Sequence, residues 1–336
     1  MSMPLQQKVA VAKYIAGKKL RGEKKYPIVL ELEPLLQCNL ACAGCGKIQH
    51  PDEILRRRLS VQECIAAVEE CGAPMVSIAG GEPLVHDQMP QIVKELVKRK
   101  KVVFLCTNAL LLKKKIDLFK PSPYFAWMIH LDGLRERHDE SVCRQGVFDK
   151  AVEAIKLAKE RGFRVYTNTT FFDQDGPESV RAVLDYLNDE LKVDMMQISP
   201  AYAYEKAPDQ EHFLGVTRTH EVFKAAFADG KRKKWRLNHS PLYLDFLEGK
   251  IDFECTPWGI PCYTVFGWQR PCYLMSDAPY AKTYKELIEE TDWDKYGRGK
   301  HPSCNNCMAH CGYEPTAVIR TTGSIKESIR AALGTT

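Results

Sequence analysis

The chain has 336 residues, of which 45% are hydrophobic and 27% are charged, and its formal net charge is +5. This is the composition of a globular protein large enough for one domain with an appendage or for two domains. The mild positive charge calls for no nucleic-acid partner, and no apolar run of about 18 residues predicts a membrane-spanning helix.

Residues 1–26 are predicted to form a basic N-terminal helix. Seven lysines and arginines lie between positions 8 and 25 beside a single acid, Glu23, and apolar residues recur among them at helical spacing. Such a helix is either a solvated surface element or one that lies on an anionic membrane surface. The stretch lacks the apolar segment and cleavage site of a signal peptide. We therefore expect a cytoplasmic protein with peripheral contact at the inner face of the membrane.

Apolar runs typical of strands alternate with helical patterns from residue 27 to about 205. The runs cover residues 28–33, 75–79, 102–106, 125–131, 164–171 and 194–199. Helical stretches between them include residues 61–71, 89–98, 148–161 and 179–190. Six strands that are each followed by a helix indicate a parallel sheet with helices outside it. Such a sheet curls into a full or partial α/β barrel, in which functional residues gather at the carboxyl ends of the strands.

The loop after the first strand carries the spacing Cys38-x3-Cys42-x2-Cys45. In a reducing compartment, clustered cysteines are metal ligands or catalytic groups rather than disulfides. Three thiolates on one loop can bind three irons of a [4Fe–4S] cluster and leave the fourth iron without a protein ligand. A structural zinc site is the alternative, but it usually takes four protein ligands and this segment offers three.

Further candidate site residues follow the other strands. They are Gly80, Gly81, Glu82 and Pro83 after the second strand, Cys106 and Asn108 at the third, His130 and Asp132 at the fourth, Asn168 on the fifth and Ile198 on the sixth. The two glycines allow another chain segment or a ligand to approach the backbone closely. The carboxyl ends of parallel strands meet at one rim, so we expect these residues to surround the same site as the three cysteines.

The cysteine spacing and the Gly-Gly-Glu-Pro turn resemble those of the radical S-adenosylmethionine (SAM) superfamily, over about residues 27–205. The resemblance implies a partial (β/α)6 barrel and a cluster on the three cysteines. It also implies SAM as co-substrate, bound by the residues from Gly80 to Pro83 and by Asn108, His130, Asp132, Asn168 and Ile198. Gly44 departs from the pattern, because family members commonly carry an aromatic residue before the last cysteine. This departure puts the packing around the adenine in doubt.

Cysteines, prolines and aromatic residues become dense after residue 205, and helical periodicity weakens. We interpret residues 206–336 as a smaller extension that covers one end of the barrel. Within it, Cys304-x2-Cys307-x3-Cys311 reverses the first spacing, and Cys272 can supply a fourth thiolate, with Cys262 and Cys255 also upstream. Four thiolates close a site, so we expect either an iron–sulfur cluster with a structural or electron-relay role or a zinc ion.

Three longer segments, residues 25–60, 130–140 and 304–315, resemble the hopanoid-biosynthesis radical SAM family, and this resemblance runs nearly end to end. It implies a transferase that adds the 5′-deoxyadenosyl radical to the terminal alkene of diploptene (hop-22(29)-ene) and forms adenosylhopane. A flavodoxin or ferredoxin-type electron donor is typical of the superfamily. Two alternatives remain: a radical SAM enzyme that abstracts hydrogen from a peptide or another small molecule, and a non-catalytic metal-binding module.

Radical addition to such an alkene leaves a tertiary radical that must receive a hydrogen atom, or an electron and a proton. Cys106 is the candidate donor because a thiol has a weak S–H bond, although a free cysteine is often only a small buried hydrophobe. Tyr202 and Tyr204 are rival donors. The hydrocarbon resides in a bilayer, so we expect residues 8–25 and the aromatic residues between 243 and 273 to contact the membrane and line an apolar pocket.

Overall fold

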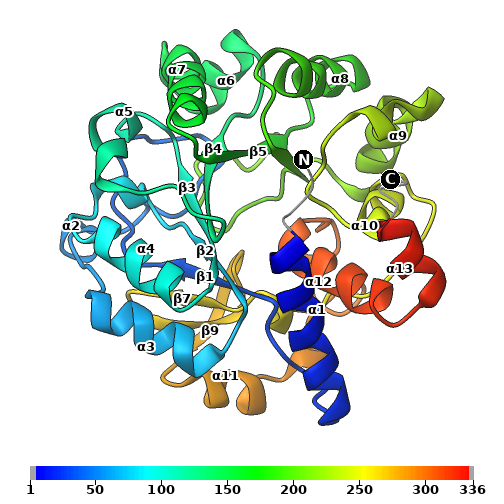
Figure 1. The fold of residues 1–336 in the computed structure, drawn as a ribbon. Helices are drawn as coiled ribbons and strands as arrows, with labels where there is room; N and C mark the ends of the chain where they lie inside the picture. The colour runs from blue at the N-terminus through cyan, green and yellow to red at the C-terminus, as the bar shows by residue number, and fades with distance from the viewer. Residues whose placement is uncertain (1–4, 333–336) are drawn as a thin grey trace.

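The computed structural model describes residues 5–332, which form a curled nine-stranded sheet with helices on its outer side (Figure 1). The first six strands are β1 (Val29–Glu33), β2 (Met75–Ile78), β3 (Val102–Thr107), β4 (Phe125–His130), β5 (Arg164–Phe171) and β6 (Met195–Pro200). The helices between them are α2 (Asp52–Leu55), α3 (Val61–Cys71), α4 (Met89–Lys98), α5 (Leu112–Lys115), α6 (Arg135–Ser141), α7 (Val147–Glu160) and α8 (Pro177–Asp185). Consecutive strands from β1 to β6 pair in parallel, which confirms the predicted partial barrel.

Side chains alternate between the two faces of each strand, as a pleated strand requires. Outward residues such as Val76, Leu105 and Trp127 are fully buried in the core that the helices cover. Inward residues change character along each strand, from apolar near the amino end to polar two residues later. The pairs are Met75 and Ser77, Phe104 and Cys106, Met128 and His130, Tyr166 and Asn168, and Met195 and Gln197. The barrel interior is therefore apolar at its base and polar at its carboxyl rim.

The chain after β6 continues the same sheet. β7 (Cys262–Thr264) pairs in parallel with β1, and β8 (Gly267–Cys272) and β9 (Met275–Ala281) add antiparallel strands beyond it. Helices are more frequent here than the weak periodicity predicted, namely α9 (Val216–Ala226), α10 (Pro241–Leu247), α11 (Tyr284–Glu290), α12 (His310–Thr321) and α13 (Ile325–Ala332). Helix α10 is buried at nearly every position, and α12 contains Pro315, so neither has a regular amphipathic pattern.

The aromatic residues between 243 and 273 mostly do not line a cavity, contrary to the prediction. Tyr243, Phe246 and Trp268 are at most 1% exposed. Phe246 stacks on Tyr313 with ring centroids 4.5 Å apart, so these rings fill the core of the extension. Tyr273 lies against the barrel cavity, which obtains its apolar lining from the strands instead.

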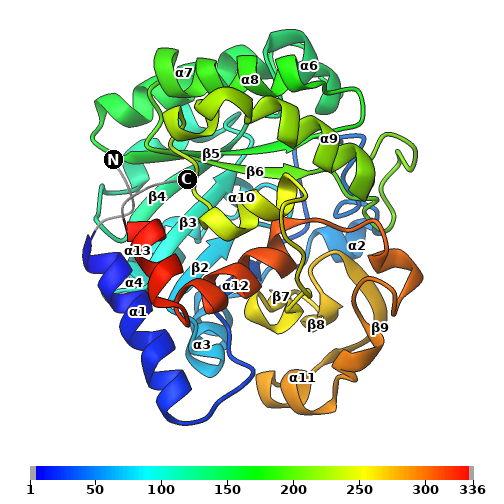
Figure 2. The same cartoon turned by 90° about the vertical axis from the view of Figure 1, so that its right-hand side faces the viewer.

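The predicted N-terminal helix is present as α1 (Leu5–Leu20) and lies beside α12 and α13 (Figures 1 and 2). The Gln7 side chain donates a hydrogen bond to the carbonyl of Pro123, just before β4. Lys19 Nζ donates to the carbonyl oxygen of Ile319 at 3.3 Å and to Thr322 Oγ1 at 3.2 Å. Helix α1 thus reaches from the start of β4 to the end of α12. No helix within residues 5–332 is long and apolar enough to cross a bilayer.

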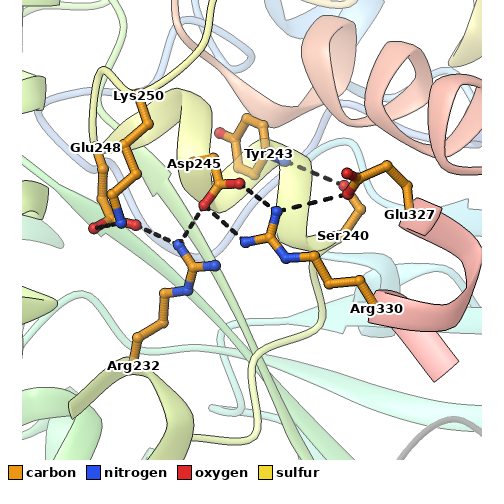
Figure 3. Close-up of polar contacts among 8 residues, drawn as sticks. All are labelled: Arg232, Ser240, Tyr243, Asp245, Glu248, Lys250, Glu327 and Arg330. Carbon is orange, nitrogen blue, oxygen red and sulfur yellow. Dashed lines mark hydrogen bonds and ion pairs between the residues drawn. The ribbon is translucent and has the colours of Figure 1, made fainter. Parts of the chain in front are cut away.

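A buried charge cluster attaches α13 to α10 (Figure 3). Arg330 of α13 forms two hydrogen bonds with Asp245 of α10, at 2.6 and 3.0 Å. Arg232 Nη1 donates to the same carboxylate at 2.9 Å and also contacts Glu248. Burial alone would raise the pKa of Asp245, but the hydrogen bonds from Arg330 and Arg232 outweigh it and lower that pKa. Asp245 is thus the shared acceptor for two guanidinium groups.

We predict that Asp245→Ala lowers the free energy of unfolding by roughly 3–5 kcal/mol, because it leaves the buried Arg232 without its full pairing. Chemical denaturation followed by circular dichroism measures this, with the exposed Glu289→Ala as control. The lowered pKa of Asp245 stabilises the fold above the carboxyl's unfolded pKa, and this contribution is lost as pH falls below about 4. Equal stability of the two variants would contradict the role of the cluster.

Candidate active site

A cavity of about 900 Å³ occupies the barrel interior. Cys38, Cys42 and Cys45 line its carboxyl end, and Met75 and Met195 line it near the amino ends of the strands. This volume lies near the upper end of the range for ligand pockets. The cavity can therefore hold a polar and an apolar ligand together.

The three cysteines share one loop after β1, and each is half-buried and free of disulfides. The backbone N–H of Leu40 donates to Cys38 Sγ at 3.4 Å, and the side-chain amide of Asn108 approaches the same sulfur at 3.8 Å. Burial raises the pKa of Cys38 to about 11, so a bound cation is needed to hold it as a thiolate. Three thiols on one loop that face a common cavity suit three irons of a cubane cluster.

Gly80 and Gly81 pack directly against the chain segment that leads into the cysteine loop. Gly80 has φ of +107°, and a Cβ at either position would overlap the backbone of Leu35 or Gln37. The N–H groups of Gly81 and Glu82 donate to the carbonyl oxygens of Leu35 and Gln37, at 3.1 and 2.9 Å. The space left by the missing side chains of these glycines is therefore filled by the backbone of the segment that leads into the cysteine loop.

Glu82 joins the ends of β2 and β3. It is 1% exposed and accepts hydrogen bonds from Thr107 Oγ1 and the N–H of Asn108, both at 2.8 Å. Burial raises the pKa of its carboxyl to about 6 in spite of these hydrogen bonds. Pro83, predicted as a SAM contact, does not line the cavity and instead begins a short 3₁₀ helix with its side chain buried. Proline suits this position because its φ is preset and its missing N–H is not needed.

His130 and Asp132, predicted together after β4, form an ion pair between a half-buried imidazole and a buried carboxylate, with Nε2 and Oδ2 2.7 Å apart. Burial would lower the pKa of His130, but the Asp132 carboxylate outweighs it and raises that pKa. Asp132 also accepts from Ser141 Oγ at 3.0 Å and from the N–H of Thr170 at 2.8 Å. The pair connects the carboxyl ends of β4 and β5 at the rim of the cavity.

The predicted residues on β5 and β6 differ in orientation. Asn168 lines the cavity, and its Oδ1 is buried without a hydrogen-bond partner, as expected for an atom that binds a ligand. Ile198 was predicted at the site, but its side chain is fully buried in the outer core. Its neighbours Gln197 and Ser199 line the cavity. Side chains alternate between the two faces of a strand, so the prediction was wrong by one position along β6.

Cys106 faces the cavity from β3, next to the apolar base. Its Sγ lies 3.6 Å from Ser77 Oγ, and Ser77 in turn hydrogen-bonds Glu31 of β1. Burial raises the pKa of the Cys106 thiol far above its usual range, which keeps its hydrogen in place. Burial and the nearby Glu33 raise the pKa of Glu31 to about 8, so it is mostly protonated at neutral pH.

Two polar groups at the cavity were not predicted. Lys47 forms a buried ion pair with Glu33, with Nζ and Oε2 2.7 Å apart, and its ammonium lies 4.4 Å from the ring centre of Tyr273. On the opposite wall, His310 of α12 contacts the Gln197 side chain at 2.8 Å. The sequence did contain a signal for Lys47, because a glutamate on a buried strand needs a cationic partner. No local pattern pointed to the second, because it joins positions 113 residues apart.

A second, smaller cavity of about 40 Å³ gathers cysteines in the extension. Its cysteines are the predicted Cys272, Cys304, Cys307 and Cys311, together with Cys255. Cys262 does not line it and lies on β7 beside β1. A Cβ on Gly312 would overlap Cys255 Sγ, so the glycine admits this fifth sulfur.

A cluster and a zinc ion require different spacings of these sulfurs. Within residues 5–332, no three cysteine sulfurs lie within 4.8 Å of one another. Tetrahedral zinc with bonds of about 2.3 Å would bring its thiolates to about 3.8 Å apart. An iron–sulfur cubane separates its ligands more widely because the cluster itself lies between them.

Comparisons with known proteins agree with this geometry. Residues 32–187 match the family model of the radical SAM superfamily, and residues 196–331 match a domain of unknown function, DUF3463. A GTP 3′,8-cyclase from Clostridium perfringens is 28% identical over 234 residues, which cover 65% of this chain and 69% of the cyclase. An Fe-coproporphyrin III synthase from Methanosarcina barkeri is 25% identical over 158 residues, 46% of this chain and 39% of the synthase.

Two solved structures share the fold. SuiB from Streptococcus suis, bound to S-adenosylmethionine, matches 76% of this chain with a TM-score of 0.60 and 17% identity. The match spans 62% of the SuiB chain. The structure of anSMEcpe with AdoMet and a peptide matches 91% of this chain and 97% of its own length, with a TM-score of 0.55 and 17% identity. These similarities establish the α/β architecture.

We predict that anaerobically reconstituted protein loses about four irons and four sulfides per chain when Cys304, Cys307 and Cys311 are changed to Ala. Changing Cys38, Cys42 and Cys45 should remove a separate set of about four. Iron and sulfide assays measure both, with Cys262→Ala as the matched control that should keep all of them. Iron loss in the control, or zinc in place of iron, would contradict the assignment of the second group.

Proposed function

We propose that this chain, whose residues 32–187 match the radical SAM superfamily, is a radical SAM adenosyltransferase that converts diploptene into adenosylhopane. Superfamily membership supplies a [4Fe–4S] cluster and SAM as its cofactors. SAM bound at the cluster supplies a 5′-deoxyadenosyl radical when one electron arrives. We assign the cluster to Cys38, Cys42 and Cys45, whose sulfurs share the polar rim of the cavity.

The rim residues suit the polar co-substrate. The unpartnered Oδ1 of Asn168 can accept a hydrogen bond from a ribose hydroxyl. Gln197 and Ser199 offer side-chain polar groups beside it. Glu82 also lines the cavity, and the hydrogen bonds that it accepts from Leu84, Thr107 and Asn108 fix its carboxylate there. These contacts would hold the adenosyl group above the interior of the barrel.

The observation that carries the proposal is the apolar base directly beneath this rim. Met75, Phe104, Met128 and Met195 line it, and each is at most 9% exposed. Burying a hydrocarbon against such surface is favourable by about 25 cal/mol for each Å² removed from water. A substrate whose alkene points toward the rim and whose rings fill the base matches this distribution of polarity.

The charge of the cavity argues against a nucleoside triphosphate, the substrate that the names of the cyclase relatives indicate. Among the described residues that line it, the lysines are Lys8 and Lys47, none is an arginine, and His130 is already paired with Asp132. Lys47 is already paired with Glu33. Sites that bind phosphate groups use several basic side chains or backbone N–H groups at a helix N-terminus.

Cys106 is placed to complete the addition. The terminal alkene carbon takes up the radical, forming one carbon–carbon bond and leaving the unpaired electron on the tertiary carbon. The Cys106 S–H then transfers its hydrogen atom, and one electron and one proton restore the thiol. SAM, the alkene, two electrons and one proton thus yield methionine and adenosylhopane. A flavodoxin or ferredoxin-type donor would supply the electrons.

The rival tyrosines are already engaged. Tyr202 Oη donates to the carbonyl of Ser303 at 2.6 Å, and Tyr204 Oη donates to the carbonyl of Tyr273 at 3.0 Å. Both hydroxyl hydrogens are therefore directed at backbone oxygens. Cys106 has only a serine hydroxyl nearby, and the protonated Glu31 beyond that hydroxyl is a proton source.

The proposed reaction predicts that adenosine appears in the hydrocarbon product. Anaerobic enzyme with SAM, dithionite and diploptene should form adenosylhopane and methionine in equal amounts, as measured by mass spectrometry. Free 5′-deoxyadenosine as the main product would indicate hydrogen abstraction, the chemistry that a peptide or other small-molecule substrate would need. Absence of reductive SAM cleavage would point to a metal-binding module.

We predict that Cys106→Ala lowers adenosylhopane formation at least about tenfold, because the tertiary radical loses its donor. A reaction of the wild type in deuterated water should leave one deuterium in the product, since a thiol exchanges with solvent. Cys64→Ala, which removes a buried thiol in α3 outside the barrel, is the control. Undiminished product from Cys106→Ala would exclude the thiol as donor.

A further inference from the structure

We propose that the hydrocarbon enters the barrel at the amino ends of its strands, through an opening between α1 and the turn that joins α12 to α13. We propose further that this base is the face that docks on an anionic membrane. The identity of the hydrocarbon rests on the proposed function, whereas the opening and the docking face rest on the observations below.

The cavity reaches the surface at the base. Lys8 of α1 and Thr322 at the end of α12 line it, and they are the exposed members of the described cavity lining. Every other described residue of the lining is buried or half-buried. The cavity lining therefore includes surface residues at the end of the barrel opposite the three cysteines.

The two sides of this opening, formed by α1 and by α12, are apolar toward the cavity. Val11 of α1 and Val318 and Ile319 of α12 pack against the inward cluster that contains Met75 and Met128. A hydrocarbon that passes between the two helices would thus contact apolar side chains from the surface to the interior. This continuity is what transfer from a bilayer requires, because exposure of the hydrocarbon to water is costly.

The outer side of the same region carries exposed apolar residues. Of the five large hydrophobic side chains that are exposed among the described residues, Val9 and Leu20 are on α1 and Ile329 is on α13. Leu20 is 89% exposed. Figures 1 and 2 both place α1, α12 and α13 side by side, so the helices that carry these residues are neighbours.

The charge of α1 indicates that this face binds an anionic bilayer. The exposed cations on this helix and in the segment after it are Lys8, Lys13, Lys19, Arg21, Lys24 and Lys25. Glu23 is the acid among them, and it is already paired with Lys18 and Arg21. Cations beside exposed apolar side chains are the combination with which helices bind anionic membrane surfaces.

The side of the opening formed by α12 and α13 is held in a fixed position. Arg330 binds Asp245 through two hydrogen bonds, which attach α13 to α10 (Figure 3). The turn between α12 and α13 is thereby restrained, whereas the described hydrogen bonds of α1 to the rest of the protein come from Gln7 and Lys19.

The docking face is tested with holoenzyme and vesicles of phosphatidylglycerol and phosphatidylcholine, without substrate. Lys8→Glu with Lys13→Glu should weaken vesicle binding roughly tenfold or more. The control is Lys114→Glu with Lys156→Glu, an equal charge change on exposed residues of α5 and α7. Equal weakening by both pairs, or equal wild-type binding to pure phosphatidylcholine, would overturn the docking face.

Hydrogen exchange locates the contact. Vesicles should protect the amides of residues 5–20 and 318–324, and protection of residues 202–213 near the cysteines instead would overturn the assignment. Because neither experiment needs turnover, a wild type that forms no adenosylhopane would refute the proposed function without affecting the docking result.

The entry path is tested by narrowing the opening from its two sides, with Thr322→Trp after α12 and Lys8→Trp on α1. Adenosylhopane formation from vesicle-borne diploptene should fall about tenfold in both, since a bulky ring would fill the opening. Iron content and the unfolding midpoint identify a variant that fails to fold. Normal rates in the folded variants would show that the hydrocarbon takes another path.

Discussion

The arrangement of the site depends on one close backbone contact, that of Gly80–Glu82 with Leu35–Gln37. The N–H groups of Gly81 and Glu82 donate to carbonyl oxygens in the segment that leads into Cys38, and any side chain at Gly80 or Gly81 would overlap it. The same turn places Glu82 against Thr107 and Asn108. The positions of the cysteine loop, the end of β2 and the end of β3 are thereby set by a single interaction.

The period-two pattern of the strands separates two environments within one barrel. Each strand from β2 to β6 places an apolar side chain inward near its amino end and a polar one two residues later. The polar groups form a rim in which each has a nearby partner or a ligand-facing atom, such as the His130–Asp132 pair and Asn168. The base has few polar groups to satisfy, which is why it suits a hydrocarbon.

Much of this organisation was predictable from the sequence. Strong apolar runs and helical periodicity located the six strands within one residue at either end, and α3 and α4 with their observed limits. The cysteine spacing and the turn at Gly80 were recognisable because each depends on local geometry. Ile198 was misjudged because an error of one residue in a strand reverses the face of the side chain.

The features that escaped prediction depend on distant parts of the chain. The sequence offered Cys255, Cys262 and Cys272 as upstream cysteines, and only the fold shows that Cys255 and Cys272, but not Cys262, line the small cavity. His310 of α12 meets Gln197 of β6. Helix α9 buries one repeating face, but α10 is buried at nearly every position and therefore has no amphipathic repeat to recognise. Lys47 was overlooked although Glu33, its partner, stands on a buried strand.

The separation of polarity along the barrel has a consequence for how a catalytic cycle ends. In the proposed reaction, a substrate whose alkene end enters first receives its adenosyl group at the far end of the barrel. When the product leaves toward the bilayer, this adenosyl group must pass Met75, Met128 and Met195. An unsatisfied polar group in such surroundings costs roughly 1–3 kcal/mol, and a nucleoside carries several. Departure of the amphiphile, rather than formation of its carbon–carbon bond, is then the step that the architecture makes slow.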